Sequence, residues 1–295
     1  MTLRLVVLGS GAAVPSPERS LTSVAMRYEG DVYLFDCGEG TQRQMMKCGI
    51  SYSKVKMIFI SHLHSDHILG IPGLIYTLSI SESERTDPLF IVGPPGTKKR
   101  IAELVGKEVP FLKIEDISPG WMIDIDGAEV KAFATDHKPG SVGYVFEEEK
   151  GLRFDKEKCQ SLGMKGRVFK TIQEKEEVTI KGKTIKLADV TYMKEGKKIV
   201  FSGDTSYSKN VVAAAKDADL LFHEATFMED MRAKAGEDRH STVSDAAKVA
   251  KEAGVKKLIL YHIGNRYKDM AAFEAEGKEI FSNLEAARDR MEILV

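Results

Sequence analysis

Three histidines and one aspartate fall within six residues of this chain, in the segment Ser61-His-Leu-His-Ser-Asp-His67. Imidazole and carboxylate groups are common ligands of zinc-class metals. The apolar run 55–60 before the segment predicts a β-strand, and residues two apart in an extended chain point the same way. We therefore expect His62 and His64 to bind one ion together, while the turn after them directs Asp66 and His67 toward a neighbouring position.

Two pairs of ligands aimed at adjacent points suit a centre of two ions about 3.5–4 Å apart. Further candidates stand in short polar segments, most of them directly after apolar runs: His137, Asp204, His223, His240 and His262. Functional groups gather on loops at one edge of a rigid scaffold, so all 7 histidines are candidates for one site. The expected chemistry is metal-dependent hydrolysis. Zinc suits this donor set, and Mn²⁺ or Fe²⁺ are alternatives.

The pattern of apolar residues indicates the elements that must position these groups. Strands are predicted at 3–8, 23–27, 32–35, 55–60, 89–92, 130–134, 142–146, 198–201, 220–222 and 257–261. Helices are predicted at 40–47, 68–79, 98–105, 211–216, 242–253 and 270–278. This mixture predicts an α/β fold in which two mixed sheets pack together and helices cover both outer faces. We expect residues 1–295 to form one such domain.

Composition limits the partners and the compartment. The chain of 295 residues has 43 Lys or Arg against 44 Asp or Glu, so its overall charge does not indicate a nucleic-acid binder. The three cysteines are far apart and form no Cys-x-x-Cys pair, which favours a reducing compartment and argues against cysteine ligands. The first residues do not resemble a signal peptide, and no apolar run reaches the roughly 18 residues that span a bilayer. We expect a cytoplasmic protein without membrane contact.

Residues 150–186 have a different composition, with eleven Lys or Arg against five Asp or Glu and little core-like periodicity. One interpretation is a solvated surface excursion. The other is an inserted basic arm that binds a polyanion through its phosphates, with Lys165, Arg167 and Lys170 as candidate contacts.

Several motifs together carry a family resemblance. They are Leu8-Gly-Ser-Gly-Ala-Ala-Val-Pro15, Phe35-Asp-Cys-Gly-Glu-Gly-Thr-Gln42, His62 to His67, Asp136-His137, Gly203-Asp204-Thr205, His223-Glu-Ala-Thr226, His240-Ser-Thr242, and His262 with Arg266-Tyr267. With these motifs the chain resembles the metallo-β-lactamase superfamily and, within it, the ribonuclease Z family of tRNA 3′-processing endonucleases.

The resemblance implies an αββα sandwich with two Zn²⁺ per subunit at one edge. By motif match, one ion is held by His62, His64 and His137, the other by Asp66, His67 and His262, and Asp204 bridges both. The resemblance further implies precursor tRNA as substrate, an arm at 150–186 that clamps the tRNA elbow, and a homodimer in which the arm of one subunit serves the active site of the other.

The same motifs suggest catalytic roles for hydrolysis of a phosphodiester. Asp66 is expected to orient or deprotonate the attacking water, and His240 to give a proton to the leaving ribose 3′ oxygen, kept protonated by Glu224. The products would be a tRNA with a 3′ hydroxyl and a trailer with a 5′ phosphate. Arg266 is either a phosphate contact or part of a structural ion pair. His223 is expected to be structural rather than catalytic.

Two other positions need an interpretation. Asp36 is expected to support the metal ligands through hydrogen bonds. The loop Pro15-Ser-Pro-Glu-Arg-Ser20 replaces the family's common Pro-x-Lys-x-Arg-Asn, a loop associated with sensing the tRNA 3′ end. Arg19 remains there as a candidate substrate contact.

Two alternatives stay open from the sequence. A small-molecule phosphodiesterase of the same superfamily would share the metal site but would not need a basic arm. A non-catalytic RNA-binding protein with a structural metal would need a closed, four-coordinate site, which this ligand set does not resemble.

Overall fold

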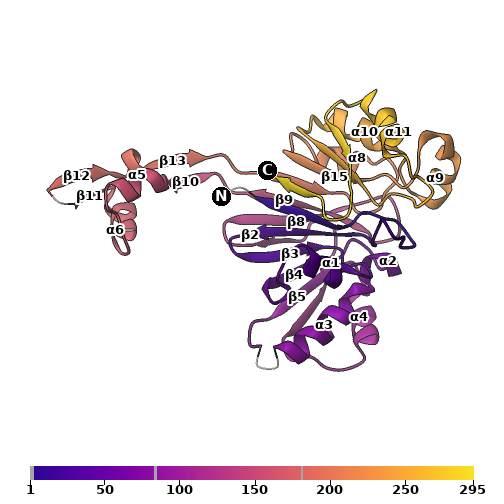
Figure 1. Ribbon diagram of the computed structural model, residues 1–295, viewed down its shortest axis with the longest axis horizontal. Coiled ribbons are helices and arrows are strands. Elements are labelled where there is room, and N and C mark those ends of the chain that lie inside the picture. Colours follow the sequence, from indigo (N-terminus) through magenta and orange to yellow (C-terminus); the bar gives the residue numbers. More distant parts are fainter. Residues whose placement is uncertain (1–2, 83–84, 181) are drawn as a thin grey trace. The chain divides into compact units, whose positions relative to one another are not determined.

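The computed structural model describes residues 3–82, 85–180 and 182–295, which divide into two compact units. The larger unit comprises Met1–Glu147 and Lys198–Val295, and the smaller, here called the inserted unit, comprises Glu148–Lys197. Within the larger unit the described residues form two seven-stranded sheets that face each other (Figure 1).

The first sheet is antiparallel at one edge and parallel at the other. Its strands run in the order β18 (Glu292–Leu294), β1 (Arg4–Gly9), β2 (Ser23–Tyr28), β3 (Asp31–Phe35), β4 (Val55–Phe59), β5 (Leu89–Gly93) and β6 (Leu112–Asp116). Strands β3 to β6 are mutually parallel.

The second sheet is also mixed. Its order is β17 (Leu284–Ala286), β16 (Leu258–Tyr261), β15 (Leu220–Glu224), β14 (Lys198–Phe201), β9 (Val142–Glu148), β8 (Ala128–Ala134) and β7 (Met122–Asp124). Strands β14 to β17 are parallel, and β9 lies antiparallel to β14. The parallel strands β14, β15 and β16 therefore bring their carboxyl ends to one edge of this sheet.

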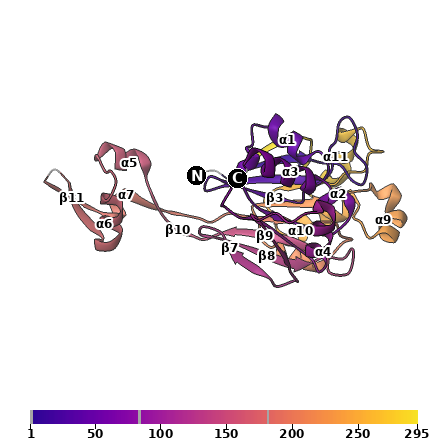
Figure 2. The same ribbon diagram turned by 90° about the horizontal axis from the view of Figure 1, so that it is seen from below.

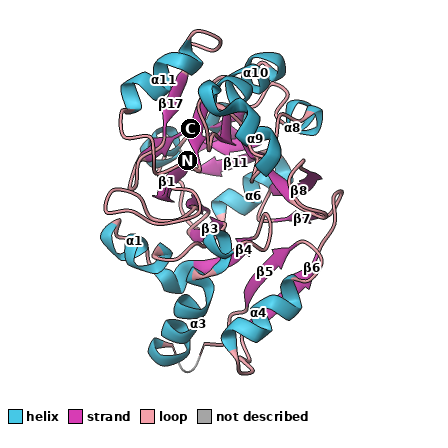
Figure 3. Cartoon of the chain, turned by 90° about the vertical axis from the view of Figure 1, so that its right-hand side faces the viewer, coloured by secondary structure: helices cyan, strands magenta, loops and turns pink. Residues whose placement is uncertain are grey.

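Helices cover both outer faces, as Figures 1 and 3 show. The helices α1 (Thr41–Lys47), α3 (Gly70–Ser81) and α4 (Thr97–Val105) pack on the first sheet through residues such as Met45, Leu74 and Ile101. The helices α8 (Lys209–Ala214), α10 (Val243–Ala253) and α11 (Met270–Lys278) pack on the second sheet. The predicted α/β sandwich is confirmed.

The core between the sheets is rich in aromatic rings. Phe35 of β3 stacks on Phe201 of β14 with ring centroids 3.6 Å apart, and Phe201 stacks on Phe222 of β15 at 5.1 Å. Because this stack includes residues from both sheets, it holds the strands whose carboxyl ends bear the candidate site at a fixed separation.

The observed elements extend and correct the sequence-based boundaries. The helix expected at 68–79 is split into α2 (Ser65–Ile68) and α3 (Gly70–Ser81). Strands β6, β7, β17 and β18 were not predicted because each is short and polar or stands at a sheet edge. The helix α9 (Arg232–Asp238) was missed because five of its seven residues are charged or glycine, which leaves no apolar face. Short 3₁₀ turns lie at Tyr52–Lys54 and Glu229–Met231.

The inserted unit has its own small core. Strand β10 (Gly151–Phe154) pairs with β13 (Thr191–Lys194), and β11 (Glu177–Ile180) pairs with β12 (Lys183–Lys186). Figure 2 labels most of its elements, which include α5 (Lys156–Ser161), α6 (Val168–Lys175) and α7 (Leu187–Val190). The buried side chains are Cys159, Met164, Ile172, Ile185 and Val190. Each element contributes only one or two of them, which explains the weak apolar pattern of the sequence. Lys181 lies outside the described residues.

Among the residues described, we find no helix with the length and apolar character needed to cross a membrane.

Candidate metal centre

Strand ends position the candidate ligands. Glu224 is the last residue of β15, His262 directly follows β16, and Asp204 stands three residues after the end of β14. Strand β4 of the facing sheet leads into the histidine cluster. Residues widely separated in sequence thus meet at one edge of the sandwich, as the order of polar residues after apolar runs predicted.

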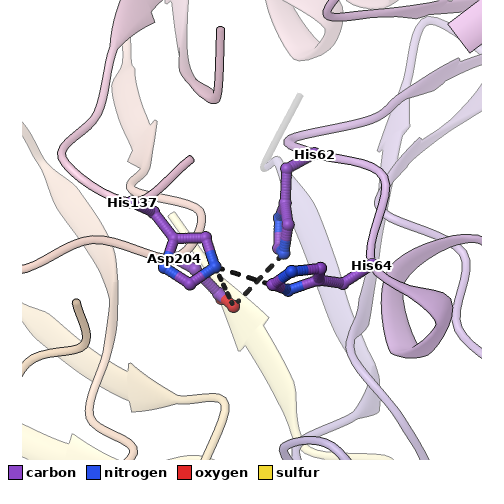
Figure 4. A group of neighbouring side chains, drawn as sticks. All are labelled: His62, His64, His137 and Asp204. Carbon is purple, nitrogen blue, oxygen red and sulfur yellow. Dashed lines mark hydrogen bonds and ion pairs between the residues drawn. The ribbon is translucent and has the colours of Figure 1, made fainter. Parts of the chain in front are cut away.

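The first group of ligand candidates is His62, His64, His137 and Asp204. Figure 4 shows their side chains pointing toward one another, with His62 and His64 on one segment and His137 and Asp204 on two others. His137 Nε2 lies 3.4 Å from His64 Nδ1. Asp204 Oδ2 lies 3.5 Å from His62 Nε2 and 4.0 Å from His137 Nε2.

The second group is Asp66, His67 and His262, and Asp204 links it to the first. His67 Nε2 and His262 Nε2 are 3.3 Å apart, and each lies 3.4 Å from the same Asp204 Oδ2. Donors bonded tetrahedrally to zinc at about 2.0–2.1 Å would stand roughly 3.3–3.4 Å apart. The observed spacing therefore fits two adjacent ions that share Asp204, and it brings together all seven residues expected as ligands.

Oxygen acceptors set the tautomers of four histidines. His67 Nδ1 donates to Asp36 Oδ2 at 2.8 Å, and His137 Nδ1 donates to the Arg239 carbonyl at 2.9 Å. Carboxylate and carbonyl oxygens only accept, so these Nδ1 atoms carry protons. The hydrogen bond expected between Asp36 and a candidate ligand is present.

Two hydroxyls set the tautomers of the other two histidines, His262 and His62. Thr226 Oγ1 lies 2.9 Å from His262 Nδ1 and donates its own proton to Glu224 Oε2. Ser61 Oγ lies 3.1 Å from His62 Nδ1 and donates to Asp36 Oδ2. Since each hydroxyl proton is used, both hydroxyls accept from the imidazole. In all four histidines Nε2 is thereby left free to bind a cation.

Two buried atoms of the centre have no hydrogen-bond partner among the described residues. They are His62 Nε2 and Asp204 Oδ1. Buried polar atoms are normally paired, and both atoms belong to residues that converge on the first group. A cation that accepts lone pairs satisfies both atoms, so the residues fit divalent metal ions.

The charges of the centre favour a cation as well. Burial lowers the pKa of His62, His64 and His137, which keeps these imidazoles neutral and able to bind metal. Burial opposes ionisation of Asp66 and Asp204, but the neighbouring histidines hold the pKa of both carboxyls below the usual range.

His67 is subject to opposing effects. Burial disfavours its charged form, yet Asp204 and Asp36 raise its pKa well above the usual value. This shift reflects the concentration of negative charge at that point, and a bound cation would take the place of the proton on Nε2.

His240 and Glu224 form a hydrogen-bonded pair beside the two groups. His240 Nδ1 lies 2.7 Å from Glu224 Oε1, whereas its distance to Asp204 Oδ2 is 3.9 Å. Burial disfavours the charged imidazole, but Glu224 raises the pKa of His240 to about 9. Although Asp204, His240 and His262 form a third cluster of ligand type, the shorter contact ties His240 to Glu224. The predicted pairing of these two residues is present.

Helix α10 helps to place His240. The Thr242 hydroxyl accepts from the Asp245 amide, and the Asp245 side chain accepts from the Thr242 amide, so the helix begins with a capping box. Ser241 donates to the Thr205 carbonyl next to Asp204. The segment that bears His240 is therefore fixed to the helix and to the Asp204 loop.

The centre opens into a cleft of about 650 Å³. His64, Asp66, His137, Asp204, His240 and His262 line it, together with Lys138 and Arg239. Arg266 is exposed near this region, with its guanidinium 5.1 Å from the centroid of the Phe227 ring, which itself lies 6.2 Å from the His240 ring. This position is compatible with the expected phosphate contact.

Other expected residues have different surroundings. Arg19 is only 8% exposed, and its guanidinium donates to Ser10 Oγ at 2.6 Å and to the Ala287 carbonyl at 2.9 Å. It anchors the first loop to the C-terminal segment. His223 is fully buried and belongs to none of the three ligand clusters, and its Nδ1 donates to the Glu224 carbonyl. In the inserted unit, Lys165, Arg167 and Lys170 are exposed.

Sequence reasoning missed the groups that orient the ligands. These are Ser61, Thr226 and the Arg239 carbonyl. A signal for Thr226 was available because it closes the His223-Glu-Ala-Thr226 motif. A backbone carbonyl has no such signal.

Comparisons with known proteins agree with this geometry. A family model described as a beta-lactamase superfamily domain matches residues 169–263, and one described as anti-Pycsar protein Apyc1 matches residues 3–101. A ribonuclease Z of Halorubrum lacusprofundi is 43% identical over 95% of this chain and 93% of its own length. A ribonuclease Z of Methanosarcina acetivorans is 40% identical over 99% and 97%. The crystal structure of the short form of human tRNase Z is similar with a TM-score of 0.71 and 30% identity, covering 98% of both chains.

The hydrogen bond from His67 to Asp36 leads to a test of the ligand geometry. Asp36→Asn removes one acceptor while keeping a residue that tolerates the left-handed backbone at φ 56°. We expect Zn²⁺ affinity, measured by chelator competition, to fall about 10- to 100-fold, as for other groups that orient ligands.

The matched control is Asp217→Asn, an exposed aspartate with the same φ of 56° that does not line the cleft. Equal Zn²⁺ affinity in the two variants would contradict a supporting role for Asp36.

Proposed function

The chain belongs to the ribonuclease Z family of tRNA 3′-processing endoribonucleases, and from that premise we propose how its own residues cut precursor tRNA. It is a hydrolase that binds divalent metal and removes the 3′ trailer. One observation carries the proposed mechanism: the two groups of candidate ligands meet at Asp204, and His240, paired with Glu224, lines the same cleft.

We propose two Zn²⁺ per subunit, with Mn²⁺ or Fe²⁺ as possible replacements. His62, His64 and His137 would hold one ion, Asp66, His67 and His262 the other, and Asp204 both. When bound, such ions supply a water of lowered pKa and offset the negative charge of the phosphate.

Asp66 is suited to orient the attacking water. The Ala13 amide donates to its Oδ2 at 2.8 Å, and His262 Nε2 lies 3.3 Å from the same oxygen. Asp66 also lines the cleft. Asp66 can therefore accept a hydrogen bond from the water as its oxygen attacks phosphorus.

His240 is suited to protonate the leaving group. Its Nδ1 is held by Glu224, so the proton on Nε2 is the one available to the ribose 3′ oxygen. As the bond from phosphorus to this oxygen breaks, the tRNA receives a 3′ hydroxyl and the phosphate remains on the trailer. Glu224, which is fully buried, compensates the positive charge of the imidazole before the transfer.

Cleavage of a 3′-extended tRNA transcript, with and without chelator, tests this proposal. Wild-type protein should cleave only without chelator. His240→Ala should keep both ions by metal analysis and lose at least about 100-fold in single-turnover rate, in line with removal of a general acid. Loss of metal in this variant would make His240 a ligand, and wild-type turnover would exclude it as the proton donor.

The inserted unit is proposed to bind the tRNA backbone. Over Glu148–Lys197 there are thirteen Lys or Arg against nine Asp or Glu, a smaller excess than over 150–186 because the unit includes four more acidic residues and only two more lysines. Within the described residues, Lys165 and Arg167 form no ion pair, and Lys170 has only Glu174 at 3.8 Å. These three cations lie at and just before the start of α6.

Charge removal in the inserted unit should separate binding from chemistry. Lys165→Ala/Arg167→Ala/Lys170→Ala should weaken binding of precursor tRNA, and the slope of log affinity against log salt should fall by about 0.7–0.9 for each phosphate that the variant no longer neutralises. Hydrolysis of bis-p-nitrophenyl phosphate should not change. Lys150→Ala is the control because Lys150 pairs with Glu195. An equal reduction on both substrates would contradict this role of the unit.

A homodimer is supported by exposed apolar side chains on α1 and α3. Helix α3 has no charged residue over its twelve positions, and Ile80 is 80% exposed on it. Leu69, Tyr76 and Met46 of α1 add exposed apolar area. Depletion of charge is typical of the centre of an interface, and an isologous contact would place the same face on both subunits. We also propose that the inserted unit of one subunit binds the tRNA that the active site of the other subunit cleaves.

Sedimentation equilibrium checks the dimer. Met46→Asp/Ile80→Asp should sediment as a monomer, whereas Leu294→Asp, at an exposed leucine of β18, should sediment as the wild type does. A dimer that persists in the first variant would exclude this face.

We further propose a cytoplasmic location, supported by three widely spaced cysteines that are all free.

A further inference from the structure

Two buried tyrosine hydroxyls bond to the backbone of the segments that carry the ligands. The segments are residues 60–67, called here the histidine segment, and residues 202–205, called here the aspartate segment. Tyr144 and Tyr261 lie in the core between the sheets, and neither belongs to any of the motifs that carry the family resemblance.

Tyr144 links the two sheets at the start of the histidine segment. It belongs to β9 of the second sheet, and its hydroxyl donates to the Ile60 carbonyl at 2.8 Å, directly after β4 of the first sheet. The Val142 amide on the same strand donates to the Ser61 carbonyl at 2.9 Å. The position of His62 relative to the second sheet therefore depends on β9.

Tyr261 makes the corresponding contact with the aspartate segment. It is the last residue of β16, and its hydroxyl accepts from the Gly203 amide at 3.0 Å. Gly203 follows β14, which is separated from β16 by β15. The hydroxyl thus holds the peptide next to Asp204 from two strands away.

The two segments touch each other at Gly203. A Cβ atom added there would lie 2.9 Å from Ser61 Cβ and 3.0 Å from the Val142 carbonyl oxygen, and the backbone has φ 61°. Only glycine fits this position without displacement. The distance between the histidine and aspartate segments is therefore defined by direct contact on one side and by the tyrosine hydroxyls on the other.

We propose that Tyr144 and Tyr261 are positioning residues that set the separation of the histidine and aspartate segments, and through it the geometry of the metal centre. This inference rests on the proposed function, because it assigns a role toward the ions that Asp204 would share. Neither tyrosine is among the described residues that line the cleft. Each acts through a backbone group, which is the Ile60 carbonyl for Tyr144 and the Gly203 amide for Tyr261.

Replacement of tyrosine by phenylalanine isolates the hydroxyls. The ring stays in the core, while the Ile60 carbonyl or the Gly203 amide loses its partner. Tyr28→Phe is a matched control because Tyr28 is buried in the same core and its hydroxyl donates to the Asp126 carbonyl, in the turn between β7 and β8.

The experiment measures Zn²⁺ affinity by chelator competition and the visible absorption spectrum of the Co²⁺-loaded protein, which reports coordination geometry. Tyr144→Phe and Tyr261→Phe should each bind Zn²⁺ about tenfold or more weakly than Tyr28→Phe does, as expected when ligands lose their orientation. Their Co²⁺ spectra should differ from the wild-type spectrum. The double variant should show the larger change.

The outcomes are distinct. If both tyrosine variants match Tyr28→Phe in affinity and spectrum, the hydroxyls support only the fold and the inference is overturned. Unequal thermal stability does not affect this comparison, because both readouts are taken on folded protein. If wild-type protein fails to bind two ions, the proposed metal centre itself is wrong, and the positioning role falls with it.

Discussion

Asp204 is a carboxylate that is only 2% exposed and faces the imidazoles of His62, His67 and His262. Removal of such a charge from water is costly unless other charges and hydrogen bonds compensate for it. Among the described residues, Oδ1 of Asp204 has no partner, so the protein alone leaves the compensation incomplete. The strand ends bring the surrounding histidines together, and the hydroxyls beside them set their tautomers. The resulting arrangement is one that bound divalent metal would complete.

The backbone around this carboxylate is held in unusual conformations. Asp36 and His262 both have positive φ, 56° and 52°, which costs a residue with a side chain about 1–2 kcal/mol each. Hydrogen bonds hold both residues: Asp36 accepts from the Ser61 amide and from His67, and the His262 ring donates to Thr226 Oγ1. Strained residues commonly lie where chemistry takes place, and here they turn a supporting carboxylate and a ligand toward the same centre.

The candidate ligands, which the structure brings together, could be picked out from the sequence because ligand chemistry is a matter of residue type and local spacing. The sandwich and most elements followed from apolar runs, and the His240–Glu224 pair followed from motifs. Arg19 could not be placed from the sequence. A charged residue in a loop suggests contact with a substrate, but the Arg19 guanidinium bonds to Ser10, Met270 and the Ala287 carbonyl. The last two lie more than 250 residues further along the chain. Contacts of this range, like those of the Tyr144 and Tyr261 hydroxyls, depend on the packing of the sheets and have no local pattern. The core of the inserted unit was not predicted because each of its elements contributes only one or two buried side chains, which is too few to give an apolar pattern.

Arg239 ends helix α9 in a left-handed conformation, and its carbonyl orients His137 while the next residue is His240. His137, the proposed metal ligand, and His240, the proposed proton donor, are therefore tied to neighbouring peptide units. A single residue inserted between Arg239 and His240 would displace the His240 side chain relative to the carbonyl that orients His137. The length of the chain at this peptide bond is therefore fixed by both contacts.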